Sequence, residues 1–128
     1  MVHSKHKGAS GERELAKEVA RLLHCSARRV QQFAGGPDSP EIVTSLSGIH
    51  FDCKRSERLL LYAALEQAIR DAGNSKIPVV CHRQNRQPWV TIVRLDDLPA
   101  LVRVLYPFID QPSEQKEQEN EKDQSDAD

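Results

Sequence analysis

Two carboxylates and a lysine lie on a pair of expected strands in the segment PEIVTSLSGIHFDCKR, residues 40–55. If Ser47-Gly48 forms a two-residue turn, directly opposed residues of this hairpin project to the same side of the sheet. Glu41 then lies opposite Lys54, and Asp52 shares the side of Lys54 because side chains alternate along a strand. We therefore expect these three side chains to converge near one end of the hairpin, although a longer turn would shift this register.

The chemistry that suits such a cluster is metal-assisted hydrolysis of a phosphodiester. Neighbouring carboxylates repel each other, and either Lys54 or a divalent cation provides a counter-charge. Mg²⁺ prefers a few carboxylates plus waters, which leaves room for a phosphate oxygen, and a bound metal lowers the pKa of its water. Lys54 would position or activate that water and stabilise charge on the scissile phosphate. The alternative is an ordinary surface ion pair, which contributes only about 0–1 kcal/mol to stability.

Hydrophobic periodicity and turn residues predict the elements that position these side chains. We expect helices at residues 10–25 and 57–72 and a short helix from Asp96 or Asp97 through Leu105, and strands at residues 28–34, 41–46, 49–54, 76–82 and 89–95. Their order is helix, three strands, helix, two strands, helix. A helix that follows a strand meander and leads to further strands predicts an α/β fold, with a mixed sheet flanked by helices.

The length of 128 residues predicts one domain with polar extensions. We expect a flexible basic arm at residues 1–8, a folded domain at residues 9–109, and a disordered tail at residues 110–128, which is poor in apolar residues. The tail holds two lysines against eight acidic residues, a formal charge of −6, whereas residues 1–109 hold 16 basic and 11 acidic residues, a charge of +5. A basic folded part is compatible with a polyanionic partner.

The cellular setting is indicated by what the sequence does not contain. No apolar run approaches the roughly 20 residues of a membrane-spanning helix, and the N-terminus lacks the apolar region of a secretory signal. The three cysteines, Cys25, Cys53 and Cys81, are odd in number and widely spaced, which indicates neither a zinc site nor a disulfide framework. We expect a cytoplasmic protein without a membrane partner.

Three motifs resemble a known family of nucleases. They are KGASGERELAKEVARLL (residues 7–23), RRVQQFAGGPDSPEIV (residues 28–43) and GIHFDCKR (residues 48–55). Together they are similar to the Holliday-junction resolvase branch of the PD-(D/E)XK nuclease superfamily, known from archaea and bacteriophages. In that branch a K-G-x-x-x-E-R-E-L helix precedes a P-D-hydrophobic strand and an (E/D)-x-K strand. The likeness covers most of residues 7–95, and it implies a restriction-endonuclease-like mixed β-sheet flanked by helices.

The resemblance also implies roles for individual residues. Glu12 matches the helix carboxylate that helps to bind metal, and Asp52 and Lys54 match the (E/D)-x-K pair. Glu41 falls on the acidic position of the P-D motif. The catalytic set is thus Glu12, Glu41, Asp52 and Lys54, and the metal ligands are the three carboxylates together with the backbone carbonyl of Cys53.

The acidic residue of the second motif is ambiguous. Glu41 stands where the family more often has aspartate, and the extra methylene would alter the distance to a metal or the rate. Asp38, in Pro37-Asp38, also spells the motif. We prefer Glu41, because it directly precedes the apolar strand and falls on the face of Asp52, whereas Asp38 lies among turn residues.

Several further polar residues are candidates for contacts with DNA. Arginines near the site would contact phosphates, and a polar residue on the helix after Lys54 often lies near the site in related nucleases. The candidates are Arg13, Arg28, Arg29, Gln67, and a patch of His82, Arg83 and Arg86 beside Trp89. For each, an ordinary surface position is the alternative, and for Trp89 a core or interface position is preferred. Glu14 lies about 200° around the helix from Glu12 and is expected to be solvated.

The resemblance predicts a Mg²⁺-dependent endonuclease, with Mn²⁺ as an alternative cofactor, that resolves branched DNA in recombination and repair. Two symmetrical nicks across a four-way junction require two active sites, which a homodimer provides. The alternatives are a nuclease of the same fold that acts on flaps, single strands or duplex DNA, and a non-catalytic DNA-binding module. The intact set of three carboxylates and one lysine argues against the last of these.

Overall fold

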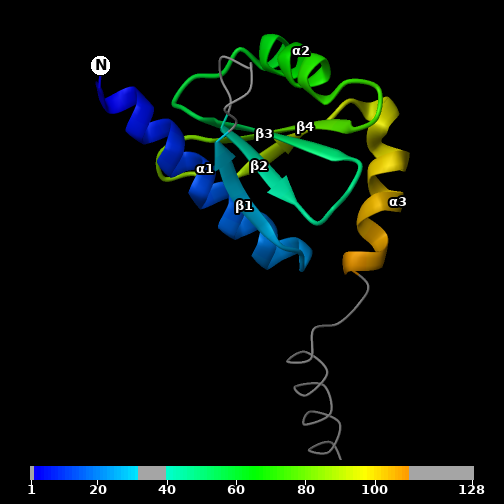
Figure 1. The fold of residues 1–128 in the computed structure, drawn as a ribbon. Helices are drawn as coiled ribbons and strands as arrows, with labels where there is room; N and C mark the ends of the chain where they lie inside the picture. Colours follow the sequence, from blue (N-terminus) through cyan, green and yellow to red (C-terminus); the bar gives the residue numbers. More distant parts are fainter. Residues whose placement is uncertain (1, 32–39, 110–128) are drawn as a thin grey trace, which may run out of the picture.

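The computed structural model describes the backbone of residues 2–31 and 40–109, and the side chains of residues 9–30 and 42–109. The elements are α1 (Val2–Leu23), β1 (Ala27–Gln31), β2 (Pro40–Thr44), β3 (Ile49–Arg55), α2 (Leu61–Ala72), β4 (Ile77–Arg83), β5 (Val90–Ile92), the 3-10 helix η1 (Leu95–Asp97) and α3 (Leu98–Ile109) (Figure 1). Their order confirms the predicted α/β class. The predicted tail, residues 110–128, lies outside the described residues.

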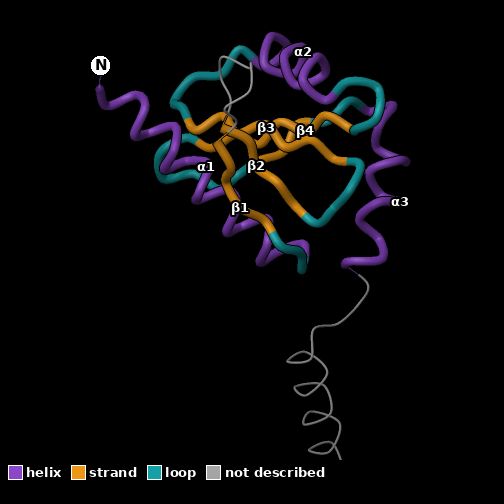
Figure 2. The backbone as a smooth tube through the Cα atoms, in the orientation of Figure 1, coloured by secondary structure: helices purple, strands orange, loops and turns teal. Residues whose placement is uncertain are grey.

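The strands form a mixed three-stranded sheet and a separate two-stranded pair. In the sheet, β3 and β4 are parallel and β4 and β5 antiparallel, in the order β3-β4-β5. α2 makes the crossover that a parallel pair requires. β1 and β2 are antiparallel, with Ala27 opposite Thr44 and Arg29 opposite Ile42. The strand that contains Asp52 and Lys54, β3, belongs to the three-stranded sheet and lies beside α2 (Figure 2).

The predicted hairpin of residues 41–46 and 49–54 is wrong. Within the described part of the chain, β2 pairs with β1 and β3 pairs with β4, so Glu41 lies opposite Val30 and Lys54 opposite His82. The turn backbone explains the difference, because the carbonyl of Gly48 accepts a hydrogen bond of 2.7 Å from the amide of Ile77 at the start of β4. The turn is thereby joined to the parallel partner strand and does not close a β2–β3 ladder.

Two apolar clusters pack on opposite sides of β3 and β4. Alternation along β4 sends Val79 and Cys81 to one side and Val80 to the other. The larger cluster lies on the side of α1 and consists of Leu15, Ala16, Val19, Ile42, Leu46, Ile49, Phe51, Val79 and Cys81. The smaller one, Ala64, Leu65, Ala68 and Val80, lies under α2. The sheet is therefore covered by helices on both faces (Figure 1).

α1 lies close to β3 at Gly11. A Cβ atom at this position would come within 2.6 Å of the Cβ of Arg55, so only glycine permits this approach. The close packing places the next residue, Glu12, near the strands, where it contacts Arg29 of β1. The helix begins at Val2 rather than near Ser10, and the residues before Ser10 include no proline that would interrupt it.

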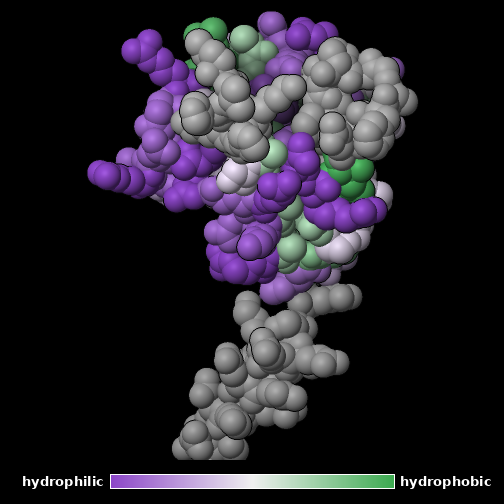
Figure 3. All heavy atoms as spheres, turned by 60° about the vertical axis from the view of Figure 1, so that its left-hand side comes forward, coloured by the Kyte–Doolittle hydropathy of each residue, from purple (hydrophilic) through white to green (hydrophobic). Residues whose placement is uncertain are grey.

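The surface of the described residues is mixed in character. The face in Figure 3 is covered largely by hydrophilic side chains, with small hydrophobic areas among them. Among the described helices, none combines the length and the apolar character needed to span a bilayer. The most apolar helix is α3, whose inner side chains pack against the larger core cluster.

Candidate active site

The site begins with the polar face of β3, which is turned toward α2. Asp52 and Lys54 lie two residues apart and share this face, and the Nζ atom of Lys54 lies 3.9 Å from Oδ1 of Asp52. The same Nζ donates a hydrogen bond of 2.9 Å to Oε1 of Gln67 on α2. The predicted Asp–Lys pair on one face is confirmed, and so is the position of Gln67 beside it.

The carboxylate of Asp52 is buried without a full set of partners. Its side chain is 15% exposed, and its buried Oδ2 atom has no hydrogen-bond partner among the residues that the structure describes. Burial raises the pKa of Asp52, an effect that the charges of Lys54 and His50 oppose and that of Asp71 reinforces. A buried carboxylate oxygen of this kind fits a cation, because a bound cation would provide the charge and the contact that the protein lacks.

Two further residues join Asp52 in a group that sequence reasoning missed. The ligand atoms of His50, Asp52 and Asp71 all lie within 4.8 Å of one another. His50 lies two residues before Asp52 and shares its strand face. Asp71 follows Gln67 by four residues on α2, and this spacing puts both on one side of the helix. These two periodicities were readable in the sequence, but the packing of α2 on β3 was not.

Replacement of Asp52 by asparagine should increase the free energy of unfolding at pH 8 when divalent cations are absent. The raised pKa means that the native state disfavours the carboxylate. The free energy of unfolding therefore falls as the pH rises. The fall begins at about pH 4, where Asp52 ionises in the unfolded state, and continues through the raised pKa of Asp52 in the folded state. A neutral amide avoids this loss.

Urea unfolding at pH 8 and pH 4 measures the effect of Asp52→Asn, which should stabilise at pH 8 and change little at pH 4. The control is Asp96→Asn at an exposed aspartate of η1, with an expected change within about 0.5 kcal/mol. Lower stability of the Asp52 variant at pH 8 would show that Lys54 and His50 outweigh burial.

Glu12 forms an ion pair with Arg29 on β1. The Nε atom of Arg29 donates a hydrogen bond of 3.0 Å to Oε1 of Glu12, and both side chains are largely buried. Arg29, which we had expected to contact DNA, therefore pairs with the expected metal ligand. Within the described residues, no hydrogen bond or ion pair joins Glu12 to Asp52 or Lys54.

The side chain of Cys53 packs against the larger core cluster, on the side of α1. Burial raises the pKa of its thiol to about 12, and the negative charges of Glu12 and Asp52 contribute to the increase, as do Cys81 and Glu14. Both carboxylates therefore act on the same buried thiol.

The choice between Glu41 and Asp38 stays a prediction. Glu41 belongs to β2, but its side chain is outside the described part of the structure, and Asp38 is outside it altogether. Our preference for Glu41 rested partly on the hairpin register, which is wrong. Its remaining support is its position at the start of an apolar strand.

Glu14 is not the solvated residue that we expected. Its carboxylate forms an ion pair with Nη1 of Arg83 and lies 3.7 Å from Nε of Arg55, so it connects α1 to β3 and β4. Arg83 also donates through Nε to the carbonyl of Gln87. Arg83, another expected DNA contact, thus has a structural role in the described contacts.

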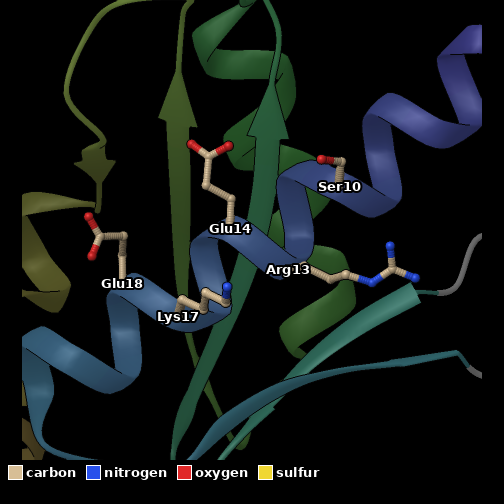
Figure 4. Close-up of a pocket in the computed structure, with 5 residues that line it drawn as sticks. All are labelled: Ser10, Arg13, Glu14, Lys17 and Glu18. Carbon is tan, nitrogen blue, oxygen red and sulfur yellow. The ribbon is translucent and has the colours of Figure 1, made fainter.

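Arg13 lines a shallow hollow of about 400 Å³ on α1, together with Ser10, Glu14, Lys17 and Glu18. Figure 4 shows Glu14 and Glu18 pointing to the same side of the helix, while Arg13 extends away from both. The hollow is mixed in charge, and Arg13 is exposed. Arg13 is thus accessible to a phosphate, and its contact with DNA stays a prediction.

The residues of the expected basic patch near Trp89 differ in their contacts and exposure. A ring nitrogen of His82 lies 2.8 Å from the carbonyl of Ser56. Trp89 packs against the larger core cluster, which confirms the preferred core position. Arg28 and Arg86 are exposed.

Comparison of the chain with protein-family models, curated proteins and solved structures finds no match. The inference about function therefore depends on the side chains and their geometry.

Proposed function

We propose that this protein is a metal-dependent endonuclease that hydrolyses DNA phosphodiester bonds, on a restriction-endonuclease-like version of the α/β fold. The observation that carries the proposal is the partly buried pair of Asp52 and Lys54. Among the described residues, one carboxylate oxygen of Asp52 has no hydrogen-bond partner, and the ammonium of Lys54 is held by Gln67. A cation and a phosphate oxygen complement these two groups.

The residues present are compatible with a divalent cation. Asp52 is the central candidate ligand, and Asp71 and His50 lie within reach of the same point. Mg²⁺ favours the carboxylates and water, whereas an imidazole is a more usual ligand of later transition metals. The resemblance adds Glu12, Glu41 and the carbonyl of Cys53 to the set, with Mn²⁺ as the alternative ion. When bound, the cation would lower the pKa of an attacking water.

The protein side chains have separate tasks in this proposal. Lys54 stabilises the negative charge that develops on the scissile phosphate, and such positioned charge acts strongly in a partly buried site. Gln67 is a positioning residue, since its amide oxygen accepts a hydrogen bond from the Lys54 ammonium. Asp52 fixes the other side of the ammonium.

The proposed substrate is branched DNA, cut by a homodimer. The charge of +5 on residues 1–109 favours a polyanion. Two copies related by a two-fold axis would place two nicks symmetrically across a four-way junction.

A non-catalytic DNA-binding module is the second candidate. The ion pair between Glu12 and Arg29 favours it, because this pair occupies a carboxylate oxygen that a metal would otherwise contact. A nuclease of the same fold that prefers flaps, single strands or duplex DNA is a variant of the first proposal.

The test is cleavage of labelled four-way junction, flap, single-stranded and duplex DNA, in Mg²⁺, in Mn²⁺ and in EDTA. We expect paired nicks in the junction with either metal and none in EDTA. Metal-dependent cleavage of another substrate first would change the substrate class. Binding of DNA without cleavage in either metal would favour the non-catalytic module.

A further inference from the structure

α3 has two apolar faces, and only one of them is packed against other described residues. The inner face, Leu101, Val104, Leu105 and Phe108, lies against the larger core cluster. The outer stripe, which we define as Leu95, Leu98, Val102, Tyr106 and Ile109, is exposed. Val102 is 54% exposed, Tyr106 62% and Leu95 81%. Large apolar side chains gathered on one exposed face mark an interaction surface.

The residues that follow α3 do not suit this stripe. Residues 110–128 are strongly acidic, and Ala127 is the one apolar residue between Gln111 and Asp128. Such a segment has no large apolar side chain to insert between Val102 and Tyr106. α3 itself carries a single charged residue, Arg103, so a strongly charged partner has little to recognise. An apolar partner surface is therefore favoured.

The outer stripe is complementary to itself. A hollow of about 200 Å³ lies near the end of α3, lined by Val102, Leu105, Tyr106 and Ile109. Leu98 projects one turn before Val102, and Tyr106 follows one turn after it. If two copies of α3 pack antiparallel with Val102 on the two-fold axis, Leu98 of each copy meets Tyr106 of the other. Each helix then offers both a projecting side chain and a hollow.

We propose that a second copy of this chain packs on the outer stripe, in an antiparallel two-fold contact centred on Val102. This contact would be the interface of the proposed homodimer. Its relevance to paired nicking rests on the proposed function as an endonuclease. A standard interface takes about 800 Å² from each partner, so the stripe forms the apolar centre of the contact and neighbouring polar surface forms the rim. The opposed helix dipoles favour the same arrangement.

This arrangement leaves both candidate active sites accessible. α3 packs on the side of the sheet that carries α1 and the larger core cluster. Lys54 contacts Gln67 of α2, on the other side. The two copies would therefore meet through α3, away from the side of the sheet on which Lys54 contacts α2.

The first test is the mass of the protein in solution, measured by light scattering over a concentration series. We expect twice the chain mass of 14.4 kDa for the unaltered protein, and half that value for Val102→Arg and Leu95→Arg. The matched control is Leu60→Arg, because Leu60 is also 81% exposed but lies beside α2. Circular dichroism checks that each variant is folded.

The second test is disulfide cross-linking with a mild oxidant. A cysteine at position 102 meets its copy on the axis, so Val102→Cys should form a covalent dimer, whereas Leu60→Cys and the unaltered protein should not. A monomer at every concentration, or a dimer that only Leu60→Arg disrupts, would overturn the proposal and leave the stripe to a different protein. Neither test contains DNA or metal, so failure here is separate from failure of the nuclease proposal.

Discussion

Replacement of Lys54 by alanine should reduce the rate of DNA cleavage by about 10²–10³-fold, the usual effect of removing one group that stabilises developing charge. The ammonium is held by Asp52 and Gln67, so it is already oriented before substrate arrives. DNA binding should change little, because the contact strengthens mainly in the transition state. Single-turnover cleavage and fluorescence anisotropy measure the two effects.

The control for this variant is Lys17→Ala, at an exposed lysine of α1 on the opposite side of the sheet. We expect its cleavage rate to stay close to that of the unaltered protein. Circular dichroism should show both variants folded. If the Lys54 variant cleaved DNA at the full rate, Lys54 would be an ordinary charged residue on a strand.

Replacement of Leu46 by alanine should lower the free energy of unfolding by about 2–5 kcal/mol. Leu46 is 1% exposed and belongs to the larger core cluster, although it lies between β2 and β3 rather than in a strand. Its amide is also satisfied locally by the Thr44 hydroxyl at 3.1 Å. The alanine would leave a cavity where β2 leads into the turn.

Urea unfolding compares Leu46→Ala with Leu60→Ala, in which the same change is made at a leucine that is 81% exposed. The exposed site should change by less than about 0.5 kcal/mol. Equal losses at the two positions would mean that the link between β2 and β3 is not part of the core.

The order of helices and strands was predictable because it depends on local patterns. The run at residues 76–82 has the apolar character of a buried strand, and β4 covers Ile77–Arg83. Gly73 ends α2 with a positive φ of 68°, the conformation for which glycine is favoured. Strand pairing was not predictable in the same way, because the bond from Ile77 to Gly48 joins residues that are distant in sequence.

In the candidate site, too, the local patterns were predictable and the long-range packing was not. The shared face of Asp52 and Lys54 follows from strand alternation, and Gln67, a candidate for which an ordinary surface position was the alternative, lies beside it. Asp71 was missed because its approach to Asp52 depends on how α2 crosses the sheet. Glu14 was misjudged for a related reason, since its partners come from β3 and β4.

The most direct test of the central claim is the rate of junction cleavage as Mg²⁺ is added back to protein treated with EDTA. We predict no cleavage without the cation, and a rate that rises and saturates with Mg²⁺ for the unaltered protein but not for Asp52→Asn. Circular dichroism checks that the asparagine variant is folded, so that its inactivity would not reflect unfolding. Cleavage that persists in EDTA, or an Asp52→Asn protein that responds to Mg²⁺ as the unaltered protein does, would contradict the assignment of this site.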